Sequence, residues 1–386
     1  MTVSAARACT VQRLRLHRFR NYAETTVHFG PRLNVISGRN AQGKTNLLEA
    51  MATLALTRSP RTASSGDLLQ WGSDRSLAEA SVSRPAYDCV LAVRLERDGA
   101  GTRVVRTSTV DGKPRPAREI LGLCPVVLFW PEDLLLVKGG PEGRRRQLDV
   151  ILSQLDPETA WHLTRYRRVL EQRNALLHQL RAAAGDRSEL HGFTRELAQH
   201  GARISVAREH LVNELTPLAA AALLELSEQH EHLSLRYAPS YAASFVDAAG
   251  AEAALLAALE ARAAEEVARG VTAVGPHRDD VEIELDGRAA RAAASQGQQR
   301  SIVLACKLAE VRHLQAHAGM APVILLDDVL SELDARRRTI LLEMLAGAAP
   351  HQVLVTTTEP LESARLFPDV RHFSVHAGAV TDSDSP

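Results

Sequence analysis

One stretch of the sequence decides the fold: Leu33-Asn34-Val35-Ile36-Ser37-Gly38-Arg39-Asn40-Ala41-Gln42-Gly43-Lys44-Thr45. From Gly38 onward it matches G-x-x-x-x-G-K-[ST], and it lies between an apolar strand pattern and a helical run over residues 44–56. Backbone N–H groups of such a loop, together with the helix N-terminus, hold the phosphates of a nucleotide. We therefore expect Lys44 to reach the β- and γ-phosphates of ATP, and the Thr45 hydroxyl to ligate Mg²⁺.

A second strand pattern ends in two carboxylates. The apolar run at residues 322–326 is followed directly by Asp327 and Asp328. A parallel strand that is buried on both faces has this continuous apolar pattern, and ligand chemistry lies at the carboxyl ends of such strands. Asp327 is expected to hold the Mg²⁺ shell, and Asp328 to act as general base on the attacking water. The alternative is that the two carboxylates cap the next helix.

The composition describes an ordinary globular chain. It has 386 residues, 45% of them apolar, and 46 Lys+Arg against 46 Asp+Glu give a net charge of zero. Binding to nucleic acid through bulk basicity is excluded, whereas a local basic patch is not. The 4 cysteines form no C-x-x-C pair, and the sequence has neither a signal peptide nor an apolar run long enough to cross a membrane. A cytoplasmic location and no membrane partner are expected.

The middle of the chain has helical periodicity. Asp156-Pro157-Glu158 is a helix-start signal, and an apolar stripe continues from it to about Ala184. After a turn at Gly185-Asp186, a second stripe runs over residues 190–215 with nearly heptad spacing. The two helices predict an antiparallel hairpin, roughly 40 Å long at 1.5 Å per residue. It either projects as an arm or forms a two-helix part of a larger core.

A polar segment directly precedes the helix expected from Ser301 to about His317: Ser295-Gln296-Gly297-Gln298-Gln299-Arg300. A hydroxyl, amides and the positive end of a helix dipole suit a phosphate. The segment resembles the signature motif of ABC-type ATPases, with Gln296 in place of a glycine and Ala294 in place of the usual leucine. This resemblance implies contact with the γ-phosphate in the other subunit, and hence an ATP-dependent homodimer. Ser331 and Asp334 resemble the D-loop at the dimer seam.

These motifs predict an α/β fold: an ABC-type ATPase head built from both chain ends, with an inserted, mostly helical lobe that carries the hairpin. We expect residues 1–140 to be the N-terminal part of the head, residues 141–268 the inserted domain, and residues 269–386 the C-terminal part. The polar residues 380–386 are expected to form a disordered tail.

Further motifs resemble the RecF family of SMC-like ATPases: Phe19-Arg20-Asn21-Tyr22, the loop with its continuation Asn46-Leu47-Leu48-Glu49-Ala50, and Gly275-Pro276-His277-Arg278-Asp279-Asp280. Ala41 replaces the family's usual glycine. By analogy, Arg20, Asn21 and Asn46 are expected near the nucleotide. The motif from Gly275 to Asp280 is either an interface or an element of the fold.

The resemblance implies a weak ATPase that serves in DNA replication and repair. As an ATP-bound dimer it would recognise duplex DNA, or duplex/single-strand junctions at gaps, and would help to load RecA together with RecO and RecR. Hydrolysis would release it. Sequence-independent DNA binding requires phosphate contacts from basic residues.

Several arginines are candidates for these contacts: Arg58, Arg61, Arg144, Arg145, Arg146, and, on the first hairpin helix, Arg165, Arg167, Arg168 and Arg173. The alternative is that they form solvated helix faces or internal ion pairs.

Three other functions compete with this interpretation. An SMC-like head would need a long coiled coil or a zinc hook. A transport ATPase subunit is disfavoured by the long separation of Thr45 from Ser295 and by threonines at 356–358, where a switch histidine is usual. A non-enzymatic, nucleotide-sensing scaffold would keep its activity after Asp328→Asn.

Overall fold

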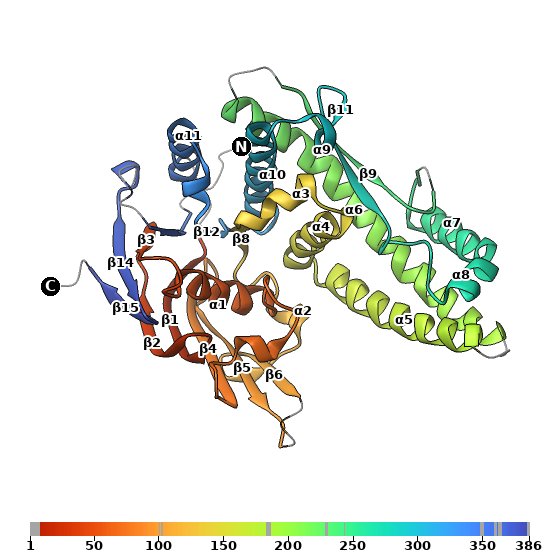
Figure 1. The fold of residues 1–386 in the computed structure, drawn as a ribbon, viewed down its shortest axis with the longest axis horizontal. Helices are drawn as coiled ribbons and strands as arrows, with labels where there is room; N and C mark the ends of the chain where they lie inside the picture. The colour runs from red at the N-terminus through yellow and green to blue at the C-terminus, as the bar shows by residue number, and fades with distance from the viewer. Residues whose placement is uncertain are drawn as a thin grey trace. The chain divides into compact units, whose positions relative to one another are not determined.

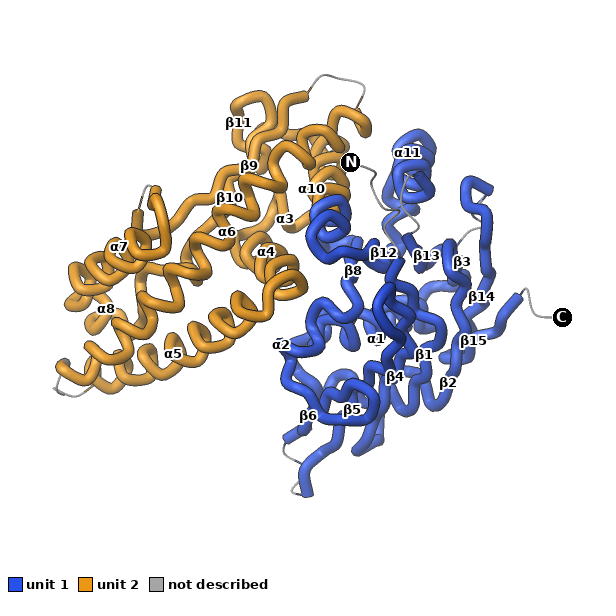
Figure 2. The backbone as a smooth tube through the Cα atoms, turned by 180° about the vertical axis from the view of Figure 1, so that it is seen from behind, with its two compact units in different colours: residues 1–133, 310–386 blue, residues 134–309 orange. Residues whose placement is uncertain are grey.

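The computed structural model describes residues 8–99, 101, 103–182, 187–227, 231–242, 244–347, 351–358, 361 and 365–383. The chain divides into two compact units (Figure 2). The first unit combines residues 1–133 with residues 310–386, and the second is the continuous segment 134–309. The expected α/β unit assembled from both chain ends is thereby confirmed.

A mostly parallel sheet forms one layer of the first unit. Its strands, in spatial order, are β15 (Ala379–Asp382), β14 (Val370–His376), β3 (Leu33–Ser37), β13 (Val353–Thr357), β12 (Val323–Asp327) and β8 (Val126–Phe129). Only β15 is antiparallel to its neighbour. Every residue of β12 is buried, as its continuous apolar pattern predicts.

An antiparallel sheet forms a second layer of the same unit. Its order is β2 (Tyr22–His28), β1 (Thr10–Phe19), β4 (Arg75–Ser83), β5 (Cys89–Arg97), β6 (Val104–Val110) and β7 (Lys113–Pro114). Helix α1 (Lys44–Leu56) contacts strands of both sheets, among them β4, β5, β8 and β12 (Figure 1). This position explains why α1 is apolar and buried on almost every side. The shorter helices of the unit are η1 (Ser65–Leu68), α2 (Ala117–Ile120) and η4 (Val329–Glu332), followed by α11 (Ala335–Ala346).

The second unit is mainly helical. Its helices are α3 (Leu135–Lys138), α4 (Pro141–Leu155), α5 (Pro157–Ala182), η3 (Arg187–Glu189), α6 (Leu190–Leu226), α7 (Ala248–Ala261), α8 (Ala263–Arg269) and α9 (Ala290–Ala293). A small sheet has the order β11 (Arg288–Ala289), β10 (Asp280–Leu285) and β9 (Leu233–Ala238). Two further helices cross the boundaries between the units: η2 (Pro131–Leu134) and α10 (Gln296–His317).

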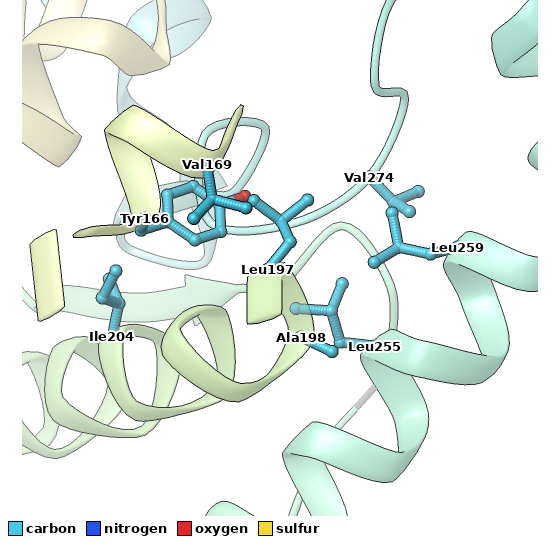
Figure 3. Close-up of a cluster of buried hydrophobic side chains, with 8 residues drawn as sticks. All are labelled: Tyr166, Val169, Leu197, Ala198, Ile204, Leu255, Leu259 and Val274. Carbon is cyan, nitrogen blue, oxygen red and sulfur yellow. The ribbon is translucent and has the colours of Figure 1, made fainter. Parts of the chain in front are cut away.

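The predicted helical hairpin is α5 and α6. Asp156 begins α5 as expected: its carboxylate accepts hydrogen bonds from the N–H groups of Glu158, at 2.9 Å, and Thr159, at 3.0 Å. The turn predicted at Gly185-Asp186 lies outside the described residues. Figure 3 shows the core between the two helices, which also takes in Leu255 and Leu259 of α7. The hairpin is therefore part of a larger helical core, which was one of the two alternatives.

Three sequence expectations differ from the structure. The domain boundaries were expected after residues 140 and 268, whereas the compact units divide after 133 and 309. Residues 269–309 thus pack with the helical unit, and their assignment to the ATPase head stays a prediction. The tail expected at 380–386 is wrong for residues 380–382, which belong to β15, while residues 384–386 lie outside the described part of the chain. The helix expected from Ser301 begins at Gln296 instead.

In the described part of the chain, no helix combines the length and the apolar character that crossing a membrane requires.

Candidate ATP-binding site

The predicted phosphate-binding loop connects β3 to α1, in the expected strand–loop–helix arrangement. Two of its glycines have backbone angles that other residues rarely adopt: φ is +153° at Gly38 and +118° at Gly43. A Cβ atom at Gly38 would lie 2.5 Å from the carbonyl oxygen of Val375, and one at Gly43 would lie 2.5 Å from the Asn21 amide nitrogen. Gly38 therefore requires glycine for space as well as for conformation, and Gly43 requires it for conformation.

The Lys44 ammonium spans this loop. It donates hydrogen bonds to the carbonyl oxygens of Gly38, at 2.6 Å, and Arg39, at 3.1 Å. Burial lowers the pKa of Lys44, and the nearby carboxylates of Asp328 and Asp327 oppose that shift. The cation thus lies where a phosphate could replace the two carbonyls as its partner.

The two expected Mg²⁺ ligands meet at the carboxyl end of β12. The Thr45 hydroxyl donates to Oδ1 of Asp327 at 3.0 Å, and the Thr356 hydroxyl donates to the same oxygen at 2.8 Å. Burial raises the pKa of Asp327, against these two hydrogen bonds. Because Mg²⁺ takes oxygen ligands, a hydroxyl beside a carboxylate at the end of a phosphate-binding loop fits this ion. Asp328 follows with φ of 53°, and its N–H donates to the Thr356 hydroxyl at 2.9 Å.

The Asn21 side chain forms hydrogen bonds with both the phosphate-binding loop and α1. Its amide nitrogen donates to the Gln42 carbonyl at 2.8 Å, and its amide oxygen accepts from the Asn46 side chain at 2.9 Å. Tyr22 adds a hydrogen bond from its hydroxyl to the Gly43 carbonyl at 3.0 Å. Asn21 and Asn46 thus lie at the loop, and their described contacts shape its backbone; their expected place near a nucleotide stays a prediction.

Arg20 is engaged elsewhere. Its guanidinium forms two hydrogen bonds with the fully buried Glu49 of α1, at 2.9 and 2.7 Å, and a third with the Asp67 carbonyl at 2.6 Å. Glu49 also accepts from Ser59 and Arg61. The described contacts of Arg20 therefore position α1 and the segment after it. The role of Glu49 was missed, although a single carboxylate in an otherwise apolar helix is a signal of a buried ion pair.

The signature segment starts α10 and caps it. The Ser295 hydroxyl accepts from the Gln298 N–H at 3.3 Å, and the Gln298 side-chain oxygen accepts from the Ser295 N–H at 2.7 Å. This reciprocal pair is a capping box. The Gln299 amide nitrogen donates to the Ala294 carbonyl at 3.0 Å, whereas its buried amide oxygen has no hydrogen-bond partner among the described residues. Ser295 and Gln296 are exposed.

The D-loop candidates also have local roles. Ser331 donates from its hydroxyl to the Asp328 carbonyl at 2.7 Å. Asp334 caps α11 by accepting from the Arg337 N–H at 2.8 Å, and it pairs with the Arg337 guanidinium at 2.6 Å. These hydrogen bonds hold the pKa of Asp334 below its usual value.

Several candidate DNA contacts are internal ion pairs. Arg144 is buried and pairs with Asp280 through two hydrogen bonds, at 2.7 and 3.0 Å, so its assignment to DNA is wrong. Arg173 is likewise buried against Glu266 at 2.6 Å. Arg145 donates to the Asp279 carbonyl at 2.7 Å, and Arg61 is held by Glu49. Arg58 and Arg146 also have interaction partners.

The motif from Gly275 to Asp280 is an element of the fold. Asp279 is fully buried and accepts hydrogen bonds from the Tyr237 and Ser205 hydroxyls and from the Ser240 N–H. The His277 ring lies 2.7 Å from the Tyr166 hydroxyl of α5. Of the two alternatives for this motif, the described contacts support the structural one.

Comparison with known proteins finds one family over most of the chain. The family model for the RecF/RecN/SMC N terminal domain matches residues 10–370. The DNA replication and repair protein RecF of Synechococcus sp. (strain JA-3-3Ab) is 43% identical over 349 residues, 89% of this chain and 90% of the relative. That of Symbiobacterium thermophilum is 41% identical over 375 residues, 96% of this chain and 98% of the relative.

Solved structures show the same similarity. The recombination mediator protein RecF-ATP of the RecFOR pathway superposes with a TM-score of 0.88 at 30% identity, covering 99% of both chains. An Smc head domain from Pyrococcus furiosus, at 15% identity, shares the fold with a TM-score of 0.56 and covers 97% of this chain and 96% of its own.

Proposed function

This chain belongs to the RecF family, and from that premise we propose that it is an ATP-dependent recombination mediator of DNA replication and repair. It binds duplex DNA, or duplex/single-strand junctions at gaps, as an ATP-bound homodimer. With RecO and RecR it helps to load RecA, and hydrolysis of ATP releases it. The observation that carries this proposal is the hydrogen bond from Thr45 to Asp327, which joins the phosphate-binding loop to an acidic strand end far along the chain.

In the proposed function, the phosphates of ATP bind to the phosphate-binding loop. The backbone N–H groups from Gly38 to Thr45 and the N-terminus of α1 surround the phosphates. Lys44 exchanges its carbonyl partners for phosphate oxygens. Thr45 and Asp327 would hold Mg²⁺, which would neutralise charge on the phosphates.

Hydrolysis is assigned to Asp328 as general base. The hydrogen bond from its N–H to Thr356 orients the main chain that carries the carboxylate. One chain carries one loop and one signature segment, so two complete sites need two copies. Because ATP bound across the seam would stabilise only the dimer, it shifts the equilibrium toward the dimer by mass action.

DNA contact is assigned to exposed arginines of the helical unit. Arg167 and Arg168 are neighbouring exposed residues on α5, and Arg146 of α4 is exposed as well. Contacts of this kind address phosphates and are independent of sequence. A cytoplasmic, nucleoid-associated location follows from this function.

The solution mass of an Asp328→Asn variant tests the proposal. This variant should bind ATP and hydrolyse it slowly. In light scattering with ATP and Mg²⁺ we expect twice the monomer mass of 42.0 kDa, and with ADP and Mg²⁺ the monomer mass itself. Lys44→Ala, which weakens phosphate binding, should remain monomeric in both. A monomer of Asp328→Asn in ATP would contradict an ATP-driven dimer.

A further inference from the structure

Thr356 lies between the two carboxylates of the candidate site. The parallel register of β12 and β13 places it opposite Asp327. Its side chain is buried, and its hydroxyl forms two hydrogen bonds. It donates to Oδ1 of Asp327 at 2.8 Å and accepts from the N–H of Asp328 at 2.9 Å.

We infer that Thr356 is a positioning residue for nucleotide hydrolysis, which orients the Asp327 carboxylate for the metal ion and the Asp328 main chain for the attacking water. The inference rests on the proposed ATPase function and assigns a role within that site. The role assigned to Thr356 is exerted through its two hydrogen-bonded neighbours, Asp327 and Asp328.

The hydroxyl chemistry determines the direction of each bond. A threonine hydroxyl has one proton to donate and lone pairs to accept with. The Thr356 hydroxyl donates its proton to Asp327, so a lone pair of the same oxygen accepts the hydrogen bond from the Asp328 N–H. One side chain of β13 thus couples consecutive residues of β12, and no other side-chain atom is needed for the coupling.

The orientation of Asp327 depends on two hydroxyls. Thr45 and Thr356 both donate to Oδ1. If the Thr45 oxygen ligates Mg²⁺, the hydroxyl proton can still point at Asp327. The hydrogen bond from Thr45 to Asp327 is therefore possible both with and without the metal ion. Thr356 belongs to β13, whereas the phosphate-binding loop follows β3. It therefore holds the carboxylate independently of how the loop responds to nucleotide.

The main chain at Asp328 also needs support. Its φ of 53° is a left-handed conformation that residues other than glycine rarely adopt. Such conformations persist where surrounding contacts determine them, and they gather at functional sites. The hydrogen bond to Thr356 and the Ser331 hydroxyl bound to the Asp328 carbonyl hold both sides of this residue.

Three variants separate positioning from mere packing. Thr356→Val keeps the shape and the strand preference but removes both hydrogen bonds. Thr356→Ser keeps the hydroxyl and loses a methyl group. Thr109→Val in β6 is the matched control, because Thr109 is also a buried strand threonine and lies outside the site.

The measurements are kcat and KM for ATP at saturating Mg²⁺, and calorimetric binding of ATP with and without Mg²⁺. For Thr356→Val we expect kcat to fall at least tenfold and the gain in ATP affinity from Mg²⁺ to fall by a similar factor. Affinity without Mg²⁺ should stay within threefold of wild type. Thr356→Ser should recover most of kcat, and Thr109→Val should match wild type.

Two results would overturn the inference. One is hydrolysis by Thr356→Val at the wild-type rate. The other is a folded Thr356→Ser that is as impaired as Thr356→Val, since a positioning hydroxyl must be rescued by serine. A wild-type protein that binds no ATP would instead refute the proposed function itself, and this assignment with it. The wild-type titration therefore tells the two failures apart.

Discussion

Individual buried polar residues in this protein have several partners each. Arg173 is held by Glu266, Thr272 and Thr194, and Asp279 accepts from three donors. Removing one partner of a buried ion pair leaves the other charge buried and uncompensated, which costs about 3–5 kcal/mol of stability. His351 is a buried group of a different kind, because burial lowers the pKa of its ring, whose Nδ1 lies 3.4 Å from the Pro322 carbonyl oxygen.

The stability of the protein should depend on pH through His351. Burial lowers its pKa to about 4 from the ordinary value of 6.5. Below pH 6.5 the unfolded chain binds a proton that the folded protein does not, so stability falls as the pH falls toward 4. Between pH 7 and pH 5 the loss from this group is about 2 kcal/mol.

Urea unfolding of wild type and His351→Gln at the two pH values checks this expectation. The decrease between pH 7 and pH 5 should be about 2 kcal/mol smaller in the variant. A remaining decrease is expected in both proteins, because burial also lowers the pKa of His277 to about 4. Equal decreases in the two proteins would show that His351 is accessible to protons in the folded state.

The helices around the hairpin pack closely at one of the two glycines of α6, Gly201, and not at the other, Gly192. Gly201 of α6 allows its neighbours to approach: a Cβ atom there would lie 2.6 Å from Leu255 and 3.1 Å from Tyr166. Gly192 of the same helix has none of the atoms of the described residues within 4 Å of such a Cβ atom. The two glycines share one helix and differ in their surroundings.

Alanine at these positions should have opposite effects. Gly→Ala in a helix stabilises by up to about 1 kcal/mol through the backbone. At Gly201, overpacking costs about 1–3 kcal/mol and outweighs that gain, so Gly201→Ala should destabilise. Gly192→Ala should leave stability unchanged or raise it. Thermal unfolding of both variants measures the difference, and a stabilised Gly201→Ala would mean that Leu255 moves aside freely.

Local sequence patterns predicted individual helices and strands better than they predicted the tertiary contacts between them. The phosphate-binding loop, the start of α5 and the apolar strand β12 follow from sequence periodicity and capping residues. The pairing of Thr356 with Asp327 joins strands that only tertiary structure brings together, so no local signal shows it. β15 was missed because its turn, Ala377-Gly378, lacks the Asn-Gly or Asp-Gly pair that marks a two-residue hairpin.

The burial of Arg144 is indicated by its spacing along α4. The run of three arginines suggested a basic surface. Helical spacing, however, places Arg144 on the face of α4 that carries Leu148, Ile151 and Leu152, all of them buried. An arginine in line with an apolar stripe indicates an internal ion pair rather than a contact with DNA.

At the scale of the whole molecule, the proposed binding of DNA by a chain of zero net charge requires local positive charge. The chain has as many basic as acidic residues, and many of its arginines are already paired internally. Phosphate contacts release counterions, so affinity falls steeply with salt. Arg167 and Arg168 of α5 are both exposed and are the contacts proposed above.

The double variant Arg167→Ala/Arg168→Ala should weaken binding to gapped duplex DNA in ATP. The slope of log affinity against log salt should decrease by about 2, roughly one for each arginine that no longer binds a phosphate. Arg288→Ala, an exposed arginine of β11, is the control and should keep the wild-type slope. Fluorescence anisotropy between 50 and 200 mM salt, roughly the range over which such slopes are resolved, supplies the data. Unchanged slopes in the double variant would place the DNA on another surface.

The order of strands in the parallel sheet has a consequence for how the protein is made. β3 and β8 leave the ribosome early, but their neighbours β12, β13 and β14 are translated only after the whole helical unit. At 5–20 residues per second, the roughly 190 residues between β8 and β12 take about 10–40 s to synthesise. During that interval β3 and β8 lack the strands with which they pair in the parallel sheet, whereas the strands of the antiparallel sheet are all available to one another. The continuous helical unit can fold first, and the ATP site is completed last.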